Sequence, residues 1–127
     1  MIINTPISLG ELVDKISILM IKKKNISDPK KLLFIKNELT MLESTLKKVI
    51  KDSKINFYLD ELIKINSKLW KIEDDIRDCE RNKIFDQKFI DLARSIYIMN
   101  DRRSEVKLQI NNNFGSKLVE VKSYEKY

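Results

Sequence analysis

Arg103 interrupts an apolar seam in the stretch LARSIYIMNDRRSEVKLQI, residues 92–110. Apolar residues recur there at helical spacing, at Leu92, Ile96, Met99, Val106 and Ile110. Arg103 occupies the seam position in the seven-residue gap of that pattern. An arginine on a buried seam carries a large desolvation cost unless it is paired or contacts an anion. Arg103 is therefore the first candidate for binding an anionic ligand.

Six further polar residues join Arg103 in a candidate ligand-binding group. They are Arg94, Arg77, Asn100, Lys22, Glu73 and Asp101. Arginine presents a fixed fork of N–H donors that fits a phosphate or a carboxylate. In this interpretation Asn100 orients the ligand, and the two carboxylates keep the arginines in place. The alternative is a ladder of ion pairs between and along helices, with no ligand.

Histidine is absent from the chain, which excludes several kinds of site. Ser-His-Asp and Cys-His pairs require it, and so do histidine-based metal sites. Catalysis would use carboxylates, lysine or tyrosine, with a hard cation such as Mg²⁺ held by oxygen ligands. The single cysteine, Cys79, falls on an apolar stripe and is expected to be a small buried hydrophobic residue.

A pair of carboxylates, Glu11 and Asp14, offers a metal-binding alternative. Their spacing is similar to the ExxD pairs with which all-helical nucleotide pyrophosphohydrolases hold Mg²⁺ on neighbouring helices. The partner pair departs from that pattern, because Asp75 and Asp78 form a DxxD and not an ExxE. The ligands of such a Mg²⁺-dependent hydrolase would be Glu11, Asp14, Glu73 and Asp101.

The net charge of +6 is concentrated in the first half of the chain. Residues 1–54 contain eleven lysines and six acidic residues, including the run of lysines at 22–24. Such a run is a solvated face or a contact for phosphates. Aromatic residues are not interleaved with these lysines, so nucleic acid is not an expected partner.

Four helices account for most of the chain. Ser8 and Glu11 are placed as a capping box for a helix that ends near Asn25. Asp28 and Pro29 start a second helix, whose heptad seam is Leu32, Ile35, Leu39, Leu42, Leu46 and Val49.

The other two helices follow the same logic. Asp52 or Ser53 caps a third helix, whose seam runs from Ile55 to Cys79. Asp86 caps a fourth helix that ends near residue 113, before a stop at Gly115, and Phe85 and Ile90 are placed as a hydrophobic staple.

The expected architecture is an all-α antiparallel bundle of four helices over residues 1–115, with an extended tail over 116–127. A long three-helix bundle with a shorter fourth helix against it fits the same pattern. Helices of this length expose surface, which favours a dimer. No apolar run approaches the roughly 20 residues of a membrane span. The first residues lack a signal-peptide pattern, so a cytoplasmic protein is expected.

Four segments, GELVDKISIL, LWKIEDDIRDCE, LARSIYIMNDRR and LVEVKSY, together resemble a small all-helical bacterial and phage family of unknown function. The resemblance covers nearly the whole chain. It implies no activity, but it implies that these four charged segments act together.

These observations favour a non-catalytic binding module, with no cofactor, for a nucleotide-like phosphorylated small molecule or an acidic partner. In that case Arg103→Leu should remove ligand binding and leave the fold intact. The alternatives are the Mg²⁺-dependent hydrolase, which Mg²⁺ should stabilise, and a structural assembly protein whose charges are all ion pairs.

Overall fold

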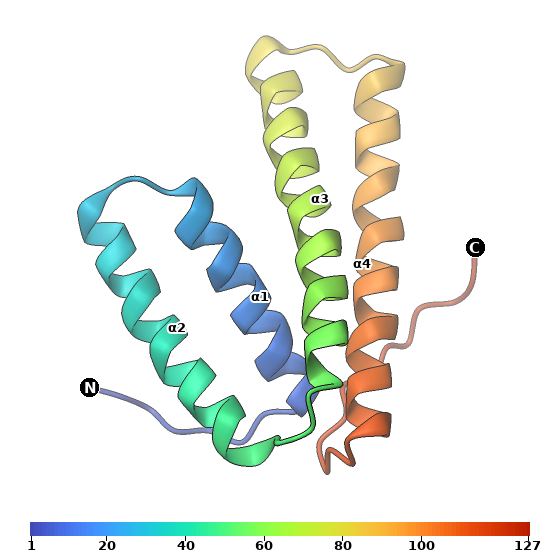
Figure 1. Cartoon of the computed structure of the whole chain (residues 1–127). Coiled ribbons are helices and arrows are strands. Elements are labelled where there is room, and N and C mark those ends of the chain that lie inside the picture. Colours follow the sequence, from blue (N-terminus) through green and yellow to red (C-terminus); the bar gives the residue numbers. More distant parts are fainter.

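The computed structural model describes all 127 residues and contains four helices and no strand. The helices are α1 (Leu9–Asn25), α2 (Pro29–Val49), α3 (Ile55–Asn82) and α4 (Gln87–Asn113). Consecutive helices are joined by short loops and run in opposite directions (Figure 1). The predicted all-α fold of four helices is confirmed. None of the helices combines the length and the apolar character that a membrane span requires.

Local capping explains where the first two helices begin. Ser8 Oγ accepts a hydrogen bond from the Glu11 N–H at 3.1 Å, as half of the expected capping box. The other half is absent, because the Glu11 carboxylate turns to Lys107. Asp28 accepts from the N–H groups of Lys30 and Lys31, and Pro29 is the first residue of α2.

The start of α3 differs from the prediction, and the start of α4 agrees with it in its cap. Lys54 stands at the N-cap of α3 without a side-chain cap, and Asp52 accepts from the Lys54 N–H. Asp86 caps α4 as expected. Phe85 packs edge-on against Phe89, with ring centroids 5.1 Å apart, and Ile90, its expected staple partner, is 46% exposed.

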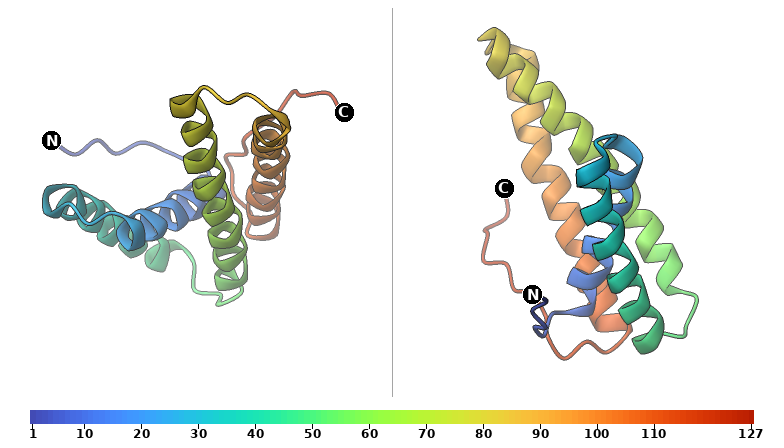
Figure 2. Two further views of the ribbon diagram at one scale, coloured as in Figure 1. Left: turned by 90° about the horizontal axis from the view of Figure 1, so that it is seen from above. Right: turned by 90° about the vertical axis from the view of Figure 1, so that its left-hand side faces the viewer.

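Helix α1 lies at the centre of the molecule. It packs against α2, α3 and α4, whereas α2 packs along α1 alone (Figure 2). Helices α1, α3 and α4 therefore pack against one another as a three-helix bundle, and α2 lies against the outer side of α1. This asymmetry explains why α1 buries side chains on both faces and α2 buries only Ile35 and Leu39.

The apolar core consists of three clusters. Leu12, Ile16 and Leu19 of α1 meet Ile35 and Leu39 of α2. On an adjoining face of α1, Val13 meets Ile55, Leu62 and Ile110 of α3 and α4. A third cluster of Ile65, Leu69 and Met99 joins α3 to α4 further along. Polar residues of α1 lie between these clusters and carry the candidate site.

Residues 116–127 contain no helix or strand. The turn before them is Gly115, whose φ of 70° lies in the left-handed region that glycine adopts most readily. The tail then passes back alongside α4 (Figure 1) and is attached there through side chains of Glu120 and Tyr127.

Candidate functional site

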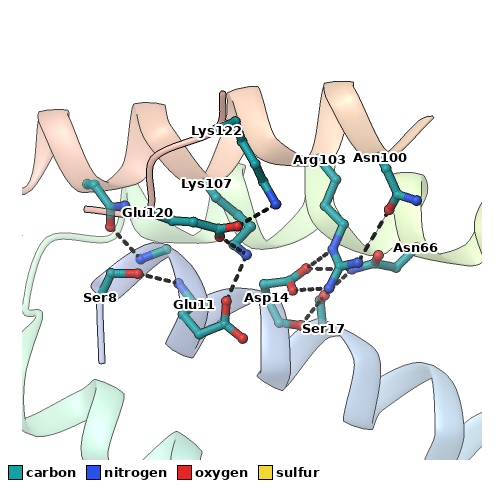
Figure 3. A network of polar contacts seen from close by, with 12 residues as sticks. Ser8, Glu11, Asp14, Ser17, Asn66, Asn100, Arg103, Lys107, Glu120 and Lys122 are labelled. Carbon is teal, nitrogen blue, oxygen red and sulfur yellow. Dashed lines mark hydrogen bonds and ion pairs between the residues drawn. The ribbon is translucent and has the colours of Figure 1, made fainter. Parts of the chain in front are cut away.

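Arg103 is paired with a buried carboxylate on a helix distant in sequence. Its Nε donates to Asp14 Oδ1 at 2.9 Å, and its Nη2 donates to Asp14 Oδ2 (Figure 3). The Asp14 side chain is completely buried, whereas that of Arg103 is 27% exposed. The hydrogen bonds from the guanidinium to Asp14 raise the pKa of Arg103 above its ordinary value. The bidentate geometry supplies the partner that an arginine on this seam requires.

Two neutral side chains complete the surroundings of Asp14. Asn66 of α3 donates through Nδ2 to Asp14 Oδ1 at 2.9 Å and to Ser17 Oγ at 2.8 Å. Ser17 in turn donates to the main-chain carbonyl of Asp14 at 2.7 Å. No buried side-chain polar atom in the molecule lacks a hydrogen-bond partner. The cluster therefore links α1, α3 and α4 without the penalty of an unsatisfied polar group.

A second ion-pair cluster lies one turn further along α4. Lys107 Nζ donates at 2.7 Å to both Glu11 of α1 and Glu120 of the tail, and Lys122 also binds Glu120 (Figure 3). Burial opposes the charge on Lys107, but the hydrogen bonds to Glu11 and Glu120 raise its pKa overall. Hydrogen bonds from Lys107 and Lys122 lower the pKa of Glu120 to about 2.

The carboxylates of the metal-binding alternative are not arranged as a Mg²⁺ site requires. Glu11 is bound by Lys107, and Asp14 is bound by Arg103. Asp101, a third ligand of that alternative, accepts a hydrogen bond from Tyr127. The structure contains no group of three or more acidic or cysteine side chains arranged to hold a metal ion. Glu11 and Asp14 are acceptors for cationic side chains and Asp101 is an acceptor for a tyrosine hydroxyl, so these carboxylates do not fit a Mg²⁺ site.

Five of the seven predicted ligand-binding residues line one groove between α1, α3 and α4. They are Lys22, Glu73, Arg77, Asn100 and Arg103, and the groove encloses about 540 Å³. The only tryptophan of the chain, Trp70, is part of its wall. Two of the lining residues, Arg103 and Asn100, contact each other, with Arg103 Nη1 3.5 Å from Asn100 Oδ1 (Figure 3).

The charged residues of the groove differ in how firmly they are held. Arg77 forms an ion pair with Glu73 one helical turn before it, and both side chains are largely solvent-accessible. Lys22 forms no ion pair within the chain, so its ammonium is available to a ligand. The expectation that Glu73 holds an arginine agrees with its contact to Arg77.

The other two predicted residues lie outside the groove. Arg94 is exposed on α4, where Tyr97 raises its pKa through a side-chain hydrogen bond. Asp101 accepts a hydrogen bond from Tyr127 Oη at 2.6 Å and faces the tail, so it holds no arginine in place. Their helix positions explain this difference, since a one-residue step rotates a side chain by about 100° around the axis.

The residues that complete the polar clusters had weak signals in the sequence. In the sequence Asp14 is half of an ExxD pair, whereas in the structure it is the ion-pair partner of Arg103. Asn66 is a polar residue beside the seam of α3, and it is 6% exposed. An amide side chain next to an apolar seam position is the sequence signal that indicates such a polar contact between helices.

Comparison with known proteins identifies the family of the chain. No curated protein and no solved structure matches it. The model of one family of unknown function, DUF6165, matches residues 3–127. That match spans all four helices, both polar clusters and the tail. The chain therefore belongs to the DUF6165 family of unknown function.

Proposed function

We propose that this protein is a non-catalytic binding module for a phosphorylated small molecule, which occupies the groove between α1, α3 and α4. The observation that supports the proposal is the convergence of Lys22, Arg77 and Arg103 with Trp70 on one groove. Three cationic side chains from three helices surround a space large enough for a nucleotide-sized ligand.

The lining of the groove suits both parts of a nucleotide. Lys22 supplies an uncompensated ammonium, and Arg77 can exchange Glu73 for a phosphate, because exposed ion pairs of this kind contribute little free energy. Trp70 offers an apolar wall against which a base can stack. Asp14 keeps the guanidinium of Arg103 in place through Nε and Nη2. Arg103 contributes to the ligand its positive charge and the edge of the guanidinium nearest Asn100, which carries Nη1.

Binding is favoured over catalysis by the chemistry of the groove. Its cationic groups are hydrogen-bond donors suited to holding an anion, and its carboxylates Glu73 and Asp74 belong to no group of acidic or cysteine side chains arranged to hold a metal ion. The arrangement therefore suits recognition of charge and of an aromatic face.

Trp70 provides the readout for a direct test, because it is the only tryptophan of the chain and lies in the wall of the groove. We expect ATP to change Trp70 emission and to raise the melting temperature, and adenosine to do so far more weakly. Lys22→Ala and Arg77→Gln should each weaken ATP binding by about tenfold or more, as expected for loss of a hydrogen bond to a charged group.

The matched controls are Lys23→Ala and Arg81→Gln, which remove the same charges on the same helices outside the groove. They should bind ATP like the unchanged protein. A panel of nucleotides, sugar phosphates and pyrophosphate that leaves both emission and melting temperature unchanged would contradict the proposal. Equal loss of affinity in the controls and the groove variants would also contradict it, since it would reflect net charge alone.

A further inference from the structure

The α3–α4 hairpin extends past the end of the α1–α2 hairpin. Helix α3 has 28 residues and α1 has 17, which corresponds to lengths of about 42 and 26 Å at 1.5 Å per residue. The loop between α1 and α2 and the loop between α3 and α4 lie toward the same end of the molecule, and the second lies further out (Figure 1). The hairpin tip therefore projects beyond the start of α2. We call the recess between them the step; residues 22–36 form one side of it and residues 73–86 the other.

Large apolar side chains are exposed on both sides of the step. On α2, Leu33 is 60% and Phe34 is 77% exposed. At the tip, Ile84, Phe85 and Ile90 are each about half exposed. Because α2 packs only along α1, its outer face has no partner within the chain. Aromatic and aliphatic side chains gathered at one end of a molecule are typical of a protein–protein contact.

The two sides of the step carry opposite charge. Residues 22–36 contain six lysines and one aspartate, whereas residues 73–86 contain six acidic and three basic residues. Lys30, Lys31 and Lys36 form no ion pair within the chain. The tip also contains a small pocket of about 200 Å³, lined by three aspartates, Asp75, Asp78 and Asp86, and by one lysine, Lys88. Asp75 and Asp78 are paired with Lys71 and Arg81 in the single chain. Exposed pairs of this kind contribute little free energy, so a lysine of a partner can replace them.

We propose that a second copy of this chain occupies the step, with the basic start of α2 of each copy on the acidic hairpin tip of the other. A two-fold axis repeats the contact, so each dimer contains two equivalent interfaces. The repetition matters because a stable interface buries roughly 1,200 Å² or more, which one helix end alone would not supply. Phe34 and Phe85 would form its apolar centre, and the lysines and aspartates its rim.

The test is the oligomeric state of the full chain, measured by analytical ultracentrifugation over a concentration series at low and high salt. We expect a dimer that weakens as salt rises, because exposed charges are screened. Lys30→Glu/Lys31→Glu and Asp75→Lys/Asp78→Lys should each raise the dimer dissociation constant by about tenfold or more, since like charges then face each other. Phe34→Ser should weaken the dimer at every salt concentration.

Mixing the two charge-reversed variants separates this arrangement from other dimers. In the mixed dimer both interfaces again join opposite charges, so an equimolar mixture should dimerise although each variant alone is monomeric. Lys47→Glu/Lys48→Glu, at the other end of α2, is the matched control and should remain dimeric. Circular dichroism melts establish that each variant is folded.

Three results would overturn the proposal. They are a monomer at every concentration, a dimer that both charge reversals leave unchanged, and two folded monomeric variants that fail to associate on mixing.

Discussion

Asp14 and Arg103 form a pair that is stabilising only while both are present. The carboxylate is completely buried, and two of its hydrogen bonds come from the guanidinium. Asn66 supplies a third contact. The ion pair with Asp14 therefore explains why an arginine stands on the apolar seam of α4. Its position in the groove wall is a consequence of that pairing.

This pairing changes the expected result of Arg103→Leu. The substitution leaves an uncompensated buried carboxylate, so we expect a loss of about 3–5 kcal/mol of unfolding free energy, measured by urea denaturation. Asp14→Asn/Arg103→Leu should recover a large part of that loss, because position 14 is then neutral and still accepts a hydrogen bond from Asn66. Equal midpoints for the single and double variants would show that the buried charge is not the cause.

At the scale of the elements, α1 crosses α4 at a very short distance. A Cβ at Gly10 would lie 2.5 Å from the main-chain oxygen of Lys107. The Gly10 N–H donates to Asn111 Oδ1 at 2.7 Å, a bond between the two helices. Glycine is a weak helix former, yet here the absence of a side chain allows α1 to reach the centre of the molecule.

Gly10→Ala should therefore destabilise the protein although alanine favours the helical conformation. The new methyl group meets main-chain atoms that cannot move aside without shifting a helix, at a cost of about 1–3 kcal/mol. Thermal and urea unfolding measure this effect. Lys15→Ala, at an exposed position of α1, is the matched control and should change stability little. A stabilised Gly10→Ala protein would contradict the close crossing.

At the scale of the whole molecule, the start of α1 and the C-terminal tail are linked through α4. Lys107 lies between Glu11 near the start of α1 and Glu120 in the tail. Ser116 Oγ accepts a hydrogen bond from the Leu9 N–H at 3.1 Å. The tail therefore connects the last helix to the first, while α2 remains at the periphery.

This connection should depend on pH in the acidic range. The pKa of Glu120 is lowered from 4.5 to about 2 in the folded protein, so its contribution is complete above about pH 4.5 and is lost as the pH falls towards 2. Carbon-13 NMR of the Glu120 carboxyl group should give a midpoint near 2, and Lys107→Met should raise it. A midpoint near 4.5 in the unchanged protein would show that the tail is not held by this ion pair.

The sequence by itself determined the four helices and most of their limits, with the start of α3 as the exception. Ser8, Asp28 and Asp86 cap helices, and Gly115 follows the last one, because capping depends on atoms within a few residues. The apolar seams of α2 and α3 could be predicted for the same reason, since helical periodicity is also a local pattern. The sequence also predicted that Lys22, Arg77, Asn100 and Arg103 belong to one polar group, from their residue types and from the seam position of Arg103.

Only the tertiary structure decided which polar residues are partners. Asp14 lies 89 residues before Arg103, and the choice between a metal ligand and an ion pair depends on how α1 and α4 are rotated against each other. The same rotation places Arg94 and Asp101 outside the groove. It is set by the packing of all the helices together, with Gly10 allowing the close crossing, so no local pattern contains it.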